Sequence, residues 1–390
     1  MCYNKHENFR FYPKEGDDIK TAGIIAEYNP FHNGHKYHIE KTREITGADA
    51  VIAIMSGNFV QRGDIAVADK FSRAKSALLG GADLVIELPC IYACQSAEFF
   101  AKGAVEIAEI LKCNYLSFGI EDDDIDSILK IAEFLKSPNH GFKEELSKLH
   151  KSGISYPKAL SSVLKSHGFG DSLDYPNNLL AAEYLKNIKT AIPVGIKREG
   201  TVHDGKGSAS DIRRMIFESD DYRDLVPPST FKILENQNIS CKTLSDIAVY
   251  KLRTMPLKEI SILPDVSEGL ENRIKEMAKK SLDIWELAEM IKTKRYTMAR
   301  IRRIIINAVI GINKTDIGKS PEYIRILGMN KKGTEVLKNL RSKTSVPIIT
   351  KTADAPKSRM LEIDTGASDI YSIISHSPAL SDYKKPPVIL

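Results

Sequence analysis

Short apolar runs alternate with amphipathic segments through the first half of the chain. Apolar residues at helical spacing predict helices over 69–81, 96–111, 124–136, 141–151, 156–166 and 177–188. Between them, continuous apolar runs predict buried strands over 22–28, 48–57, 82–89, 114–119 and 191–198. Buried strands that alternate with helices are typical of a parallel sheet covered on both faces. Such sheets bind ligands outside the carboxyl ends of their strands.

The strand pattern fades after about residue 220. A Pro-Pro pair predicts a linker over 224–234, and residues 345–354 can form one further strand. Helical spacing predicts helices over 242–254, 268–279, 282–291, 296–310 and 331–341. The predicted fold class is therefore α/β: a Rossmann-like, parallel five-stranded sheet, followed by a mainly helical, basic C-terminal domain. We expect a loose polar leader over 1–20, the sheet domain over 21–222 and the helical domain over 223–390.

Composition excludes several classes of protein. Hydrophobic residues make up 42% of the 390 residues and charged residues 27%, as in an ordinary globular protein. No run of 18 apolar residues occurs, so we expect no membrane span. The cysteines are odd in number and scattered, which favours free thiols in a reducing cytoplasm over disulfides or a zinc site. They are Cys2, Cys90, Cys94, Cys113 and Cys241.

Positive charge is concentrated in one segment. Residues 291–350 hold 14 of the 56 Lys and Arg but only 3 of the 51 Asp and Glu. On a helical wheel, Arg295, Arg300, Arg302 and Arg303 share one arc, and the opposite arc is apolar. We expect the basic arc to face solvent, where it can bind a polyanion or simply remain a solvated surface.

Three of the nine histidines lie within "AEYNPFHNGHKYHIEK", residues 26–41. His32, His35 and His38 could form a metal site, form a phosphate site or pack in the core. They follow the first predicted strand and an Asn-Pro turn, at a junction with a helix. A helix N-terminus offers free N–H groups to an anion, and Gly34 permits close approach. The position therefore favours phosphate, most strongly for His32 and His35.

A second motif supports the phosphate interpretation. "GKGSASDIRRMI", residues 205–216, follows the last predicted strand and opens a helix. Ser208 and Ser210 offer hydroxyls, and Arg213 follows one turn later. With the N–H groups of that helix they can form an anion cradle, although a serine there is often only an N-cap.

The two motifs carry a family resemblance. "HNGH" resembles the HxGH signature of the nucleotidyltransferase superfamily, and "SASDIR" resembles its ISSTxIR signature. Further blocks resemble the bacterial tRNA(Met) cytidine acetate ligase family, from about residue 22 to 375. They are "GIIAEYNPFHNGHKYH", "MSGNFVQRGDIAVADKFSRAKSALLGGADLVIELP", "SFGIE", "YPNNLLAAEYL", "IKREG", "KRYTMARIRRIIINAVIGI" and "YIRILGMNKKG".

The resemblance implies an ATP site in the sheet domain, with His32, His35 and Arg213 as catalytic residues. The ATP-binding residues that it implies begin with one continuous stretch after the first strand. That stretch is Ile25, Ala26, Glu27, Tyr28, Asn29, Pro30, Phe31, His32, Asn33, Gly34, His35, Lys36, Tyr37 and His38. To these we add Gly119, Arg198, Ser208, Ser210 and an asparagine of the "PNN" turn, with Asn177 and Asn178 both open.

The resemblance also implies a reaction. The family activates acetate with ATP to acetyl-adenylate, then acetylates N4 of the wobble cytidine of elongator tRNA(Met) to give N4-acetylcytidine. Mg²⁺ on the phosphates is part of the expectation, without an evident protein ligand except, by position, Glu27. We expect tRNA contacts from Arg295, Arg300, Arg302 and Arg303. Two alternatives stay open: nucleotidyl transfer to a small metabolite, and a non-catalytic RNA-binding protein.

Overall fold

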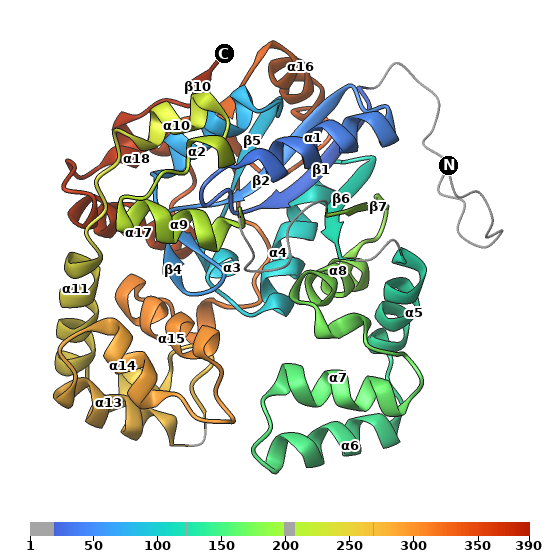
Figure 1. Ribbon diagram of the computed structural model, residues 1–390. Coiled ribbons are helices and arrows are strands. Elements are labelled where there is room, and N and C mark those ends of the chain that lie inside the picture. Colours follow the sequence, from blue (N-terminus) through green and yellow to red (C-terminus); the bar gives the residue numbers. More distant parts are fainter. Residues whose placement is uncertain (1–18, 122–123, 199–206, 268) are drawn as a thin grey trace.

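The computed structural model describes residues 19–121, 124–198, 207–267 and 269–390. Residues 1–18 of the predicted leader therefore lie outside the described residues. One large sheet has the strand order β10-β8-β5-β2-β1-β6-β7, with β9 beside β8, and helices cover both of its faces (Figure 1). Its strands are β1 (Thr21–Ala26), β2 (Ala50–Ser56), β5 (Leu84–Leu88), β6 (Tyr115–Ile120), β7 (Ile192–Lys197), β8 (Ile324–Met329), β9 (Ile348–Ile349) and β10 (Val388–Ile389).

All five predicted strands form, and they pair in parallel as β5-β2-β1-β6-β7. The α/β architecture with a parallel central sheet is thus confirmed, but the expected number of five strands was too low. The C-terminal strand β8 pairs antiparallel with β5 and brings β9 and β10 with it. β8 escaped prediction because Arg325 interrupts its apolar run. A second, two-stranded sheet joins β3 (Phe59–Val60) to β4 (Asp64–Ile65).

Helices from the first half of the chain build both layers around the sheet. α1 and α2 pack on one face, whereas α4 and α8 pack on the other (Figure 1). The predicted helices all form in this half. Their bounds are α1 (Asn33–Thr46), α2 (Lys70–Leu79), α3 (Cys90–Ala93), α4 (Ala97–Ile110), α5 (Ile125–Lys136), α6 (His140–Lys151), α7 (Tyr156–Ser166), η1 (Ser172–Asp174), α8 (Pro176–Asn187) and α9 (Ala209–Glu218).

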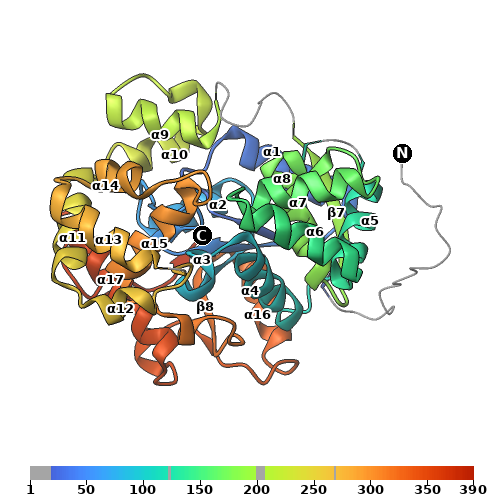
Figure 2. The same cartoon turned by 90° about the horizontal axis from the view of Figure 1, so that it is seen from below.

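The second half adds a helical lobe and closes the sheet. Figure 2 shows α11, α13, α14 and α15 on one side of the molecule and α5, α6 and α7 on the other. The bounds in this half are η2 (Arg223–Leu225), α10 (Pro228–Leu234), α11 (Cys241–Thr254), α12 (Leu257–Ser261), α13 (Leu270–Lys280), α14 (Ile284–Ile291), α15 (Met298–Ile310), η3 (Lys314–Asp316), α16 (Lys331–Leu340), η4 (Thr352–Asp354), α17 (Arg359–Ile374) and α18 (Ser381–Lys384). The domain boundary at residue 222 stays a prediction. Strands β8, β9 and β10 follow that boundary in the chain but belong to the same sheet as the strands before it.

Two segments of this half differ from expectation. The predicted linker contains helix α10, because a proline is tolerated at the first helical position, where its missing N–H is not needed. Helix α17 was not predicted, although it has 16 residues. It buries polar residues such as Asp364, Ser368 and Ser372. Those buried polar residues blur the apolar stripe that would mark a helix.

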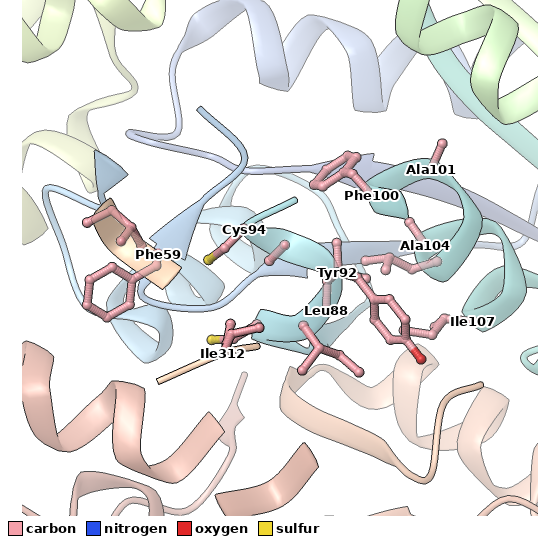
Figure 3. Packing of buried hydrophobic residues seen from close by; sticks show 14 of the residues in the cluster. Phe59, Leu88, Tyr92, Cys94, Phe100, Ala101, Ala104, Ile107 and Ile312 are labelled. Atoms are coloured by element: carbon pink, nitrogen blue, oxygen red, sulfur yellow. The ribbon is translucent and has the colours of Figure 1, made fainter. Parts of the chain in front are cut away.

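The main hydrophobic core lies between the sheet and α3, α4 and the C-terminal helices. Figure 3 shows Tyr92 of α3 beside Ala104 and Ile107 of α4. This approach depends on Gly103, where any Cβ would collide with the Tyr92 ring. Cys90, Cys94 and Cys113 are buried free thiols in this core, and Cys241 is a partly buried free thiol. The expectation of unpaired cysteines is confirmed for these four residues.

A buried group of charged side chains ties the C-terminal helices to the sheet. Lys70 of α2 donates from Nζ to Glu87 of β5 at 2.6 Å and to Asp382 of α18 at 3.0 Å. Arg325 of β8 donates to the same Asp382 at 2.8 Å. Burial and the nearby Glu87 carboxylate raise the pKa of Asp364 to about 7. We call these five residues the Lys70 cluster; it joins five elements, α2, β5, β8, α17 and α18.

Candidate active site

A cavity of about 500 Å³ opens at the carboxyl ends of β1, β6 and β7. This is where open parallel sheets place their ligands. The N-termini of α1 and α9 face it, and residues of α4, α8 and the loop 56–64 complete its lining. In the sheet, β1 is flanked by β2 and β6, so the cavity lies near the middle of this edge.

His32 and His35 form the start of α1. His32 is the N-cap residue, and its Nδ1 accepts from the Gly34 N–H at 3.0 Å. His35 Nδ1 accepts in return from the His32 N–H at 3.2 Å, so the pair forms a capping box. Their rings stack with centroids 3.7 Å apart. Because a Cβ on residue 34 would touch the His32 ring, glycine is needed at this position. In both rings Nδ1 is engaged with backbone, which leaves Nε2 available to a ligand.

Both histidines are neutral at physiological pH. Burial lowers the pKa of His32 to about 3, with further lowering by Arg198 and Arg213. Burial and the neighbouring His32 also hold the pKa of His35 well below its usual range. Each imidazole can therefore present an Nε2–H to an anion, because its Nδ1 already accepts. A bound polyphosphate would favour the protonated form.

His38 differs from the other two histidines. It lines the cavity, but its Nε2 lies 2.9 Å from Ser117 Oγ of β6. That hydroxyl is also 2.7 Å from Thr42 of α1. Burial and then Arg198 lower the pKa of His38 to about 4. His38 thus serves to join α1 to β6, and its ring is already committed.

The second predicted motif forms the opposite wall. Ser208 is the N-cap residue of α9 and accepts from the Asp211 N–H at 3.1 Å. Arg213 reaches across to Asn29, donating to its carbonyl at 2.8 Å, and also donates to Ser210 Oγ at 3.2 Å. The structure therefore brings the two motifs together across one cavity, although about 180 residues separate them. Residues 205 and 206 of the motif lie outside the described residues.

The β6 and β7 side of the cavity separates the two candidate asparagines. Asn177 lines the cavity, with Gly119 and Arg198. Asn178 is fully buried, accepts from the Glu121 N–H at 3.0 Å and donates to the Ser172 carbonyl at 3.0 Å. It holds the backbone and does not line the cavity.

Most of the stretch 25–38 lines the cavity, but four of its residues do not. Phe31 is buried in the core beneath α1, and Asn29 bonds to the backbone of Ile65 and Val67. Pro30 follows Asn29 through a cis peptide bond. Lys36 points to solvent and lies 3.8 Å from Glu40. These four shape the loop and cannot all touch one small ligand.

The apolar wall of the cavity was not predicted from the sequence. Phe100, Phe118, Leu180 and Tyr184 line it, and the rings of Phe118 and Tyr184 lie 5.7 Å apart. Their positions fit core packing equally well, so no sequence signal separates them from core residues. Gln61 and Arg62, from the loop after β2, also line the cavity.

Lys70 and Arg73 of α2 follow that loop in the chain but do not line the cavity, and both are structural. Lys70 belongs to the buried cluster described above. Arg73 is also fully buried and donates to the carbonyls of Glu27 at 2.6 Å and Ser56 at 3.0 Å. It therefore clamps the carboxyl ends of β1 and β2 together beneath the site.

The basic arc of α15 is only partly exposed. Arg303 is buried and pairs with Asp265 at 3.0 Å, so the prediction that it faces solvent is wrong. Arg300 donates to the Asp265 carbonyl at 2.6 Å, and Arg302 lies over the Trp285 ring at 4.4 Å. The reason is that α15 is enclosed by neighbouring helices on most sides. Arg295, Arg300 and Arg302 remain half-buried at the surface.

The fold and the paired motifs define a class, the HxGH nucleotidyltransferases. A family model described as HIGH Nucleotidyl Transferase matches residues 19–385. Among solved structures, Thermotoga maritima TmcAL bound with alpha-thio ATP superposes with a TM-score of 0.88 at 32% identity. That match covers 95% of this chain and 100% of the other.

Similar proteins of known name identify the family within the HxGH nucleotidyltransferases. The tRNA(Met) cytidine acetate ligase of Thermoanaerobacter sp. (strain X514) is 42% identical, over 90% of this chain and 94% of the relative. The enzyme of the same name from Clostridium tetani is 41% identical, over 95% of this chain and 100% of its own. The chain therefore belongs to the tRNA(Met) cytidine acetate ligase family.

Proposed function

We propose that this protein is a ligase that activates acetate with ATP and transfers the acetyl group to N4 of the wobble cytidine of elongator tRNA(Met), giving N4-acetylcytidine. The observation that carries the proposal is the pairing of His32 and His35 at the start of α1 with Ser208 and Arg213 at the start of α9, across one cavity. Two helix N-termini and two aligned imidazoles suit a polyphosphate. The cytoplasm is the proposed setting. In the described part of the chain, no helix is long and apolar enough to cross a membrane.

The nucleotide site would use the residues that line the cavity. We assign the phosphates to His32, His35, Ser210 and Arg213, because N–H and guanidinium donors converge there. Gly119, Asn177 and Arg198 would hold base and ribose at the ends of β6 and β7. The backbone of the loop after β1 would support the triphosphate from below, whereas Asn29, Pro30, Phe31, Lys36 and Asn178 act indirectly.

Charge stabilisation and positioning are the main chemical work of such a site. An acetate oxygen attacks the α-phosphorus and pyrophosphate leaves, so negative charge grows on the phosphate oxygens. The Nε2–H groups of His32 and His35 and the Arg213 guanidinium would stabilise that charge. No covalent intermediate with the protein is required.

Mg²⁺ remains part of the proposal, as a charge-neutralising ion on the phosphates. Within the described ranges, no group of three or more His, Cys, Asp or Glu could hold a metal ion. Mg²⁺ commonly keeps several waters and binds through substrate phosphates with one or two carboxylates. Of the carboxylates that line the cavity, Asp224 could take that part.

The acceptor tRNA would bind over the helical lobe. Arg295, Arg300 and Arg302 lie at its surface, and Arg302 stacks on Trp285, which is 40% exposed. Arginine and tryptophan planes together suit the phosphates and unstacked bases of an RNA loop. The target cytidine would leave its stack to reach the cavity.

The function is tested by incubating the protein with ATP and a panel of carboxylates, with and without tRNA. We expect pyrophosphate exchange that depends on acetate and needs no tRNA. Pyrophosphate release that ignores acetate but needs a phosphorylated metabolite would indicate nucleotidyl transfer to that metabolite instead. Tight tRNA binding without any nucleotide turnover would indicate a non-catalytic RNA-binding protein.

The two adjacent asparagines offer a first prediction. Asn177→Ala should weaken ATP binding about tenfold, by loss of about 1.4 kcal/mol of hydrogen bonding, with little change in stability. Asn178→Ala should instead lower the free energy of unfolding by about 1–3 kcal/mol, because buried backbone groups lose their partners. Calorimetric titration with ATP and urea unfolding of both variants check this. The reverse pattern would exchange the two assignments.

The arginines of α15 give a second prediction. Arg302→Ala should weaken tRNA binding and reduce the slope of log Kd against log salt by about 1, the effect of one lost phosphate contact. Arg303→Ala should mainly destabilise the fold, because Asp265 loses its buried partner. Fluorescence titrations between low and moderate salt, with urea unfolding as control, measure both. An unchanged slope for Arg302→Ala would remove it from the RNA interface.

A further inference from the structure

The cavity has two walls of opposite character. Arg198 and Arg213 act electrostatically on the histidine side, where both lower the pKa of His32. Glu27 also lines the cavity, with the aromatic residues Phe100, Phe118 and Tyr184, and its carboxylate adds to the effect of burial in raising the pKa of Tyr184. An anionic phosphate belongs on the first wall. The wall with Glu27 and the aromatic rings suits a flat, uncharged ring whose amino group can donate a hydrogen bond to the carboxylate.

Glu27 is held with one oxygen turned to the protein. Its Oε1 accepts from the Gln61 N–H at 2.8 Å, and its own carbonyl is fixed by Arg73 at 2.6 Å. Within the described part of the chain, the Oε2 of Glu27 makes no hydrogen bond that competes with a ligand. The side chain is half-buried and lines the cavity. The Glu27 carboxylate is therefore held in a fixed orientation, with Oε2 available to a ligand.

The loop that orients Glu27 is anchored on the helical lobe. Gln61 donates from its side chain to the Gln95 carbonyl at 3.1 Å, and the Gln95 side chain donates to Asn307 of α15 at 2.9 Å. Gly63 packs so closely on the start of α15 that any Cβ there would strike the backbone of Arg302 and Arg303. Glu27 thus lies on the side of the cavity that faces the proposed RNA surface. Gly119 and Arg198 lie on the other side of β1.

We infer that Glu27 is the proton acceptor for acetyl transfer to the cytidine amine, an inference that rests on the proposed function. N4 bonds to the acetyl carbonyl carbon, and the bond from that carbon to the AMP phosphate oxygen breaks, its electron pair leaving on AMP. The N4 proton passes to the Glu27 carboxylate, which later releases it to water. Formation of the adenylate moves no proton, so Glu27 acts in the second step alone.

The two half-reactions separate this inference from its rivals. Glu27→Gln keeps the acceptor for the Gln61 N–H but cannot take a proton. In single turnovers with preformed acetyl-adenylate and tRNA, we expect transfer to slow about 10²–10⁴-fold, the usual contribution of a general base. Acetate-dependent pyrophosphate exchange should fall at least about tenfold less than transfer does. Glu27→Asp, which keeps a carboxylate, should lose less transfer activity than Glu27→Gln.

The controls distinguish failure of this inference from failure of the proposed function. Glu98→Gln removes an exposed carboxylate from the first turn of α4, outside the cavity lining, and should leave both half-reactions unchanged. Equal losses of exchange and transfer in Glu27→Gln would make Glu27 a nucleotide or Mg²⁺ ligand and overturn the inference. Undiminished transfer would overturn it too. A wild-type protein without acetate-dependent exchange would instead refute the proposed function.

Discussion

His35→Ala should lower acetate-dependent pyrophosphate exchange about 10²–10³-fold, the usual cost of removing one transition-state donor. The His35 imidazole is buried at the start of α1 with Nδ1 bound to backbone, so its Nε2–H can only serve the cavity. Affinity for tRNA should change less than about twofold, because the printed contacts of the His35 ring in the described part of the chain are with His32, Tyr28 and Phe31 and not with α15. Exchange assays and tRNA titrations measure the two effects.

The matched control is His140→Ala, which removes an exposed imidazole from the first turn of α6. It should leave exchange and tRNA binding unchanged. Thermal unfolding must accompany His35→Ala, since loss of the capping box costs about 1 kcal/mol. Lost tRNA affinity with intact exchange would contradict the assignment and remove the histidines from the phosphate site.

Lys70→Met should produce the largest loss of stability among single changes outside the cavity. The Lys70 ammonium lies between Glu87 and Asp382, and all three side chains are about 1–2% exposed. Removing it leaves the carboxylates of the Lys70 cluster with Arg325 as their remaining cation. Breaking a buried pair in this way costs about 3–5 kcal/mol. We therefore expect a clearly lower urea midpoint.

Lys242→Met provides the comparison, because Lys242 pairs with Asp246 on the exposed surface of α11. Such pairs contribute about 0.3–0.5 kcal/mol, so its urea midpoint should barely move. Equal stability of Lys70→Met and the wild type would mean that the cluster does not hold the C-terminal helices on the sheet.

Sequence pattern predicted the fold where burial is simple. The five parallel strands are continuous apolar runs, and the helices between them have apolar stripes or capping residues, so local chemistry and position agree. Prediction failed where polar residues are buried by distant partners. Arg325 within β8 and Asp364 within α17 are satisfied by residues such as Glu87 and Tyr323, which no local pattern reveals.

The candidate site divides in the same way. His32, Gly34 and Ser208 were predictable because they lie at the starts of α1 and α9, which local spacing indicates. Arg303 was wrongly predicted to face solvent, because a helical wheel contains no information about Asp265, which lies in another segment and pairs with Arg303. Phe100 and Tyr184 were missed because an aromatic residue that lines a cavity resembles a core residue in sequence. Choosing Asn177 over Asn178 needed the position of Glu121.

The most direct test of the central claim follows isotopically labelled acetate into RNA. The protein, ATP and labelled acetate are incubated with elongator tRNA(Met) and, separately, with the same tRNA carrying uridine at the wobble position, and nucleosides are analysed by mass spectrometry. The account predicts labelled N4-acetylcytidine from the first tRNA only, with AMP and pyrophosphate as co-products. Label that never enters cytidine, although adenylate forms, would contradict it.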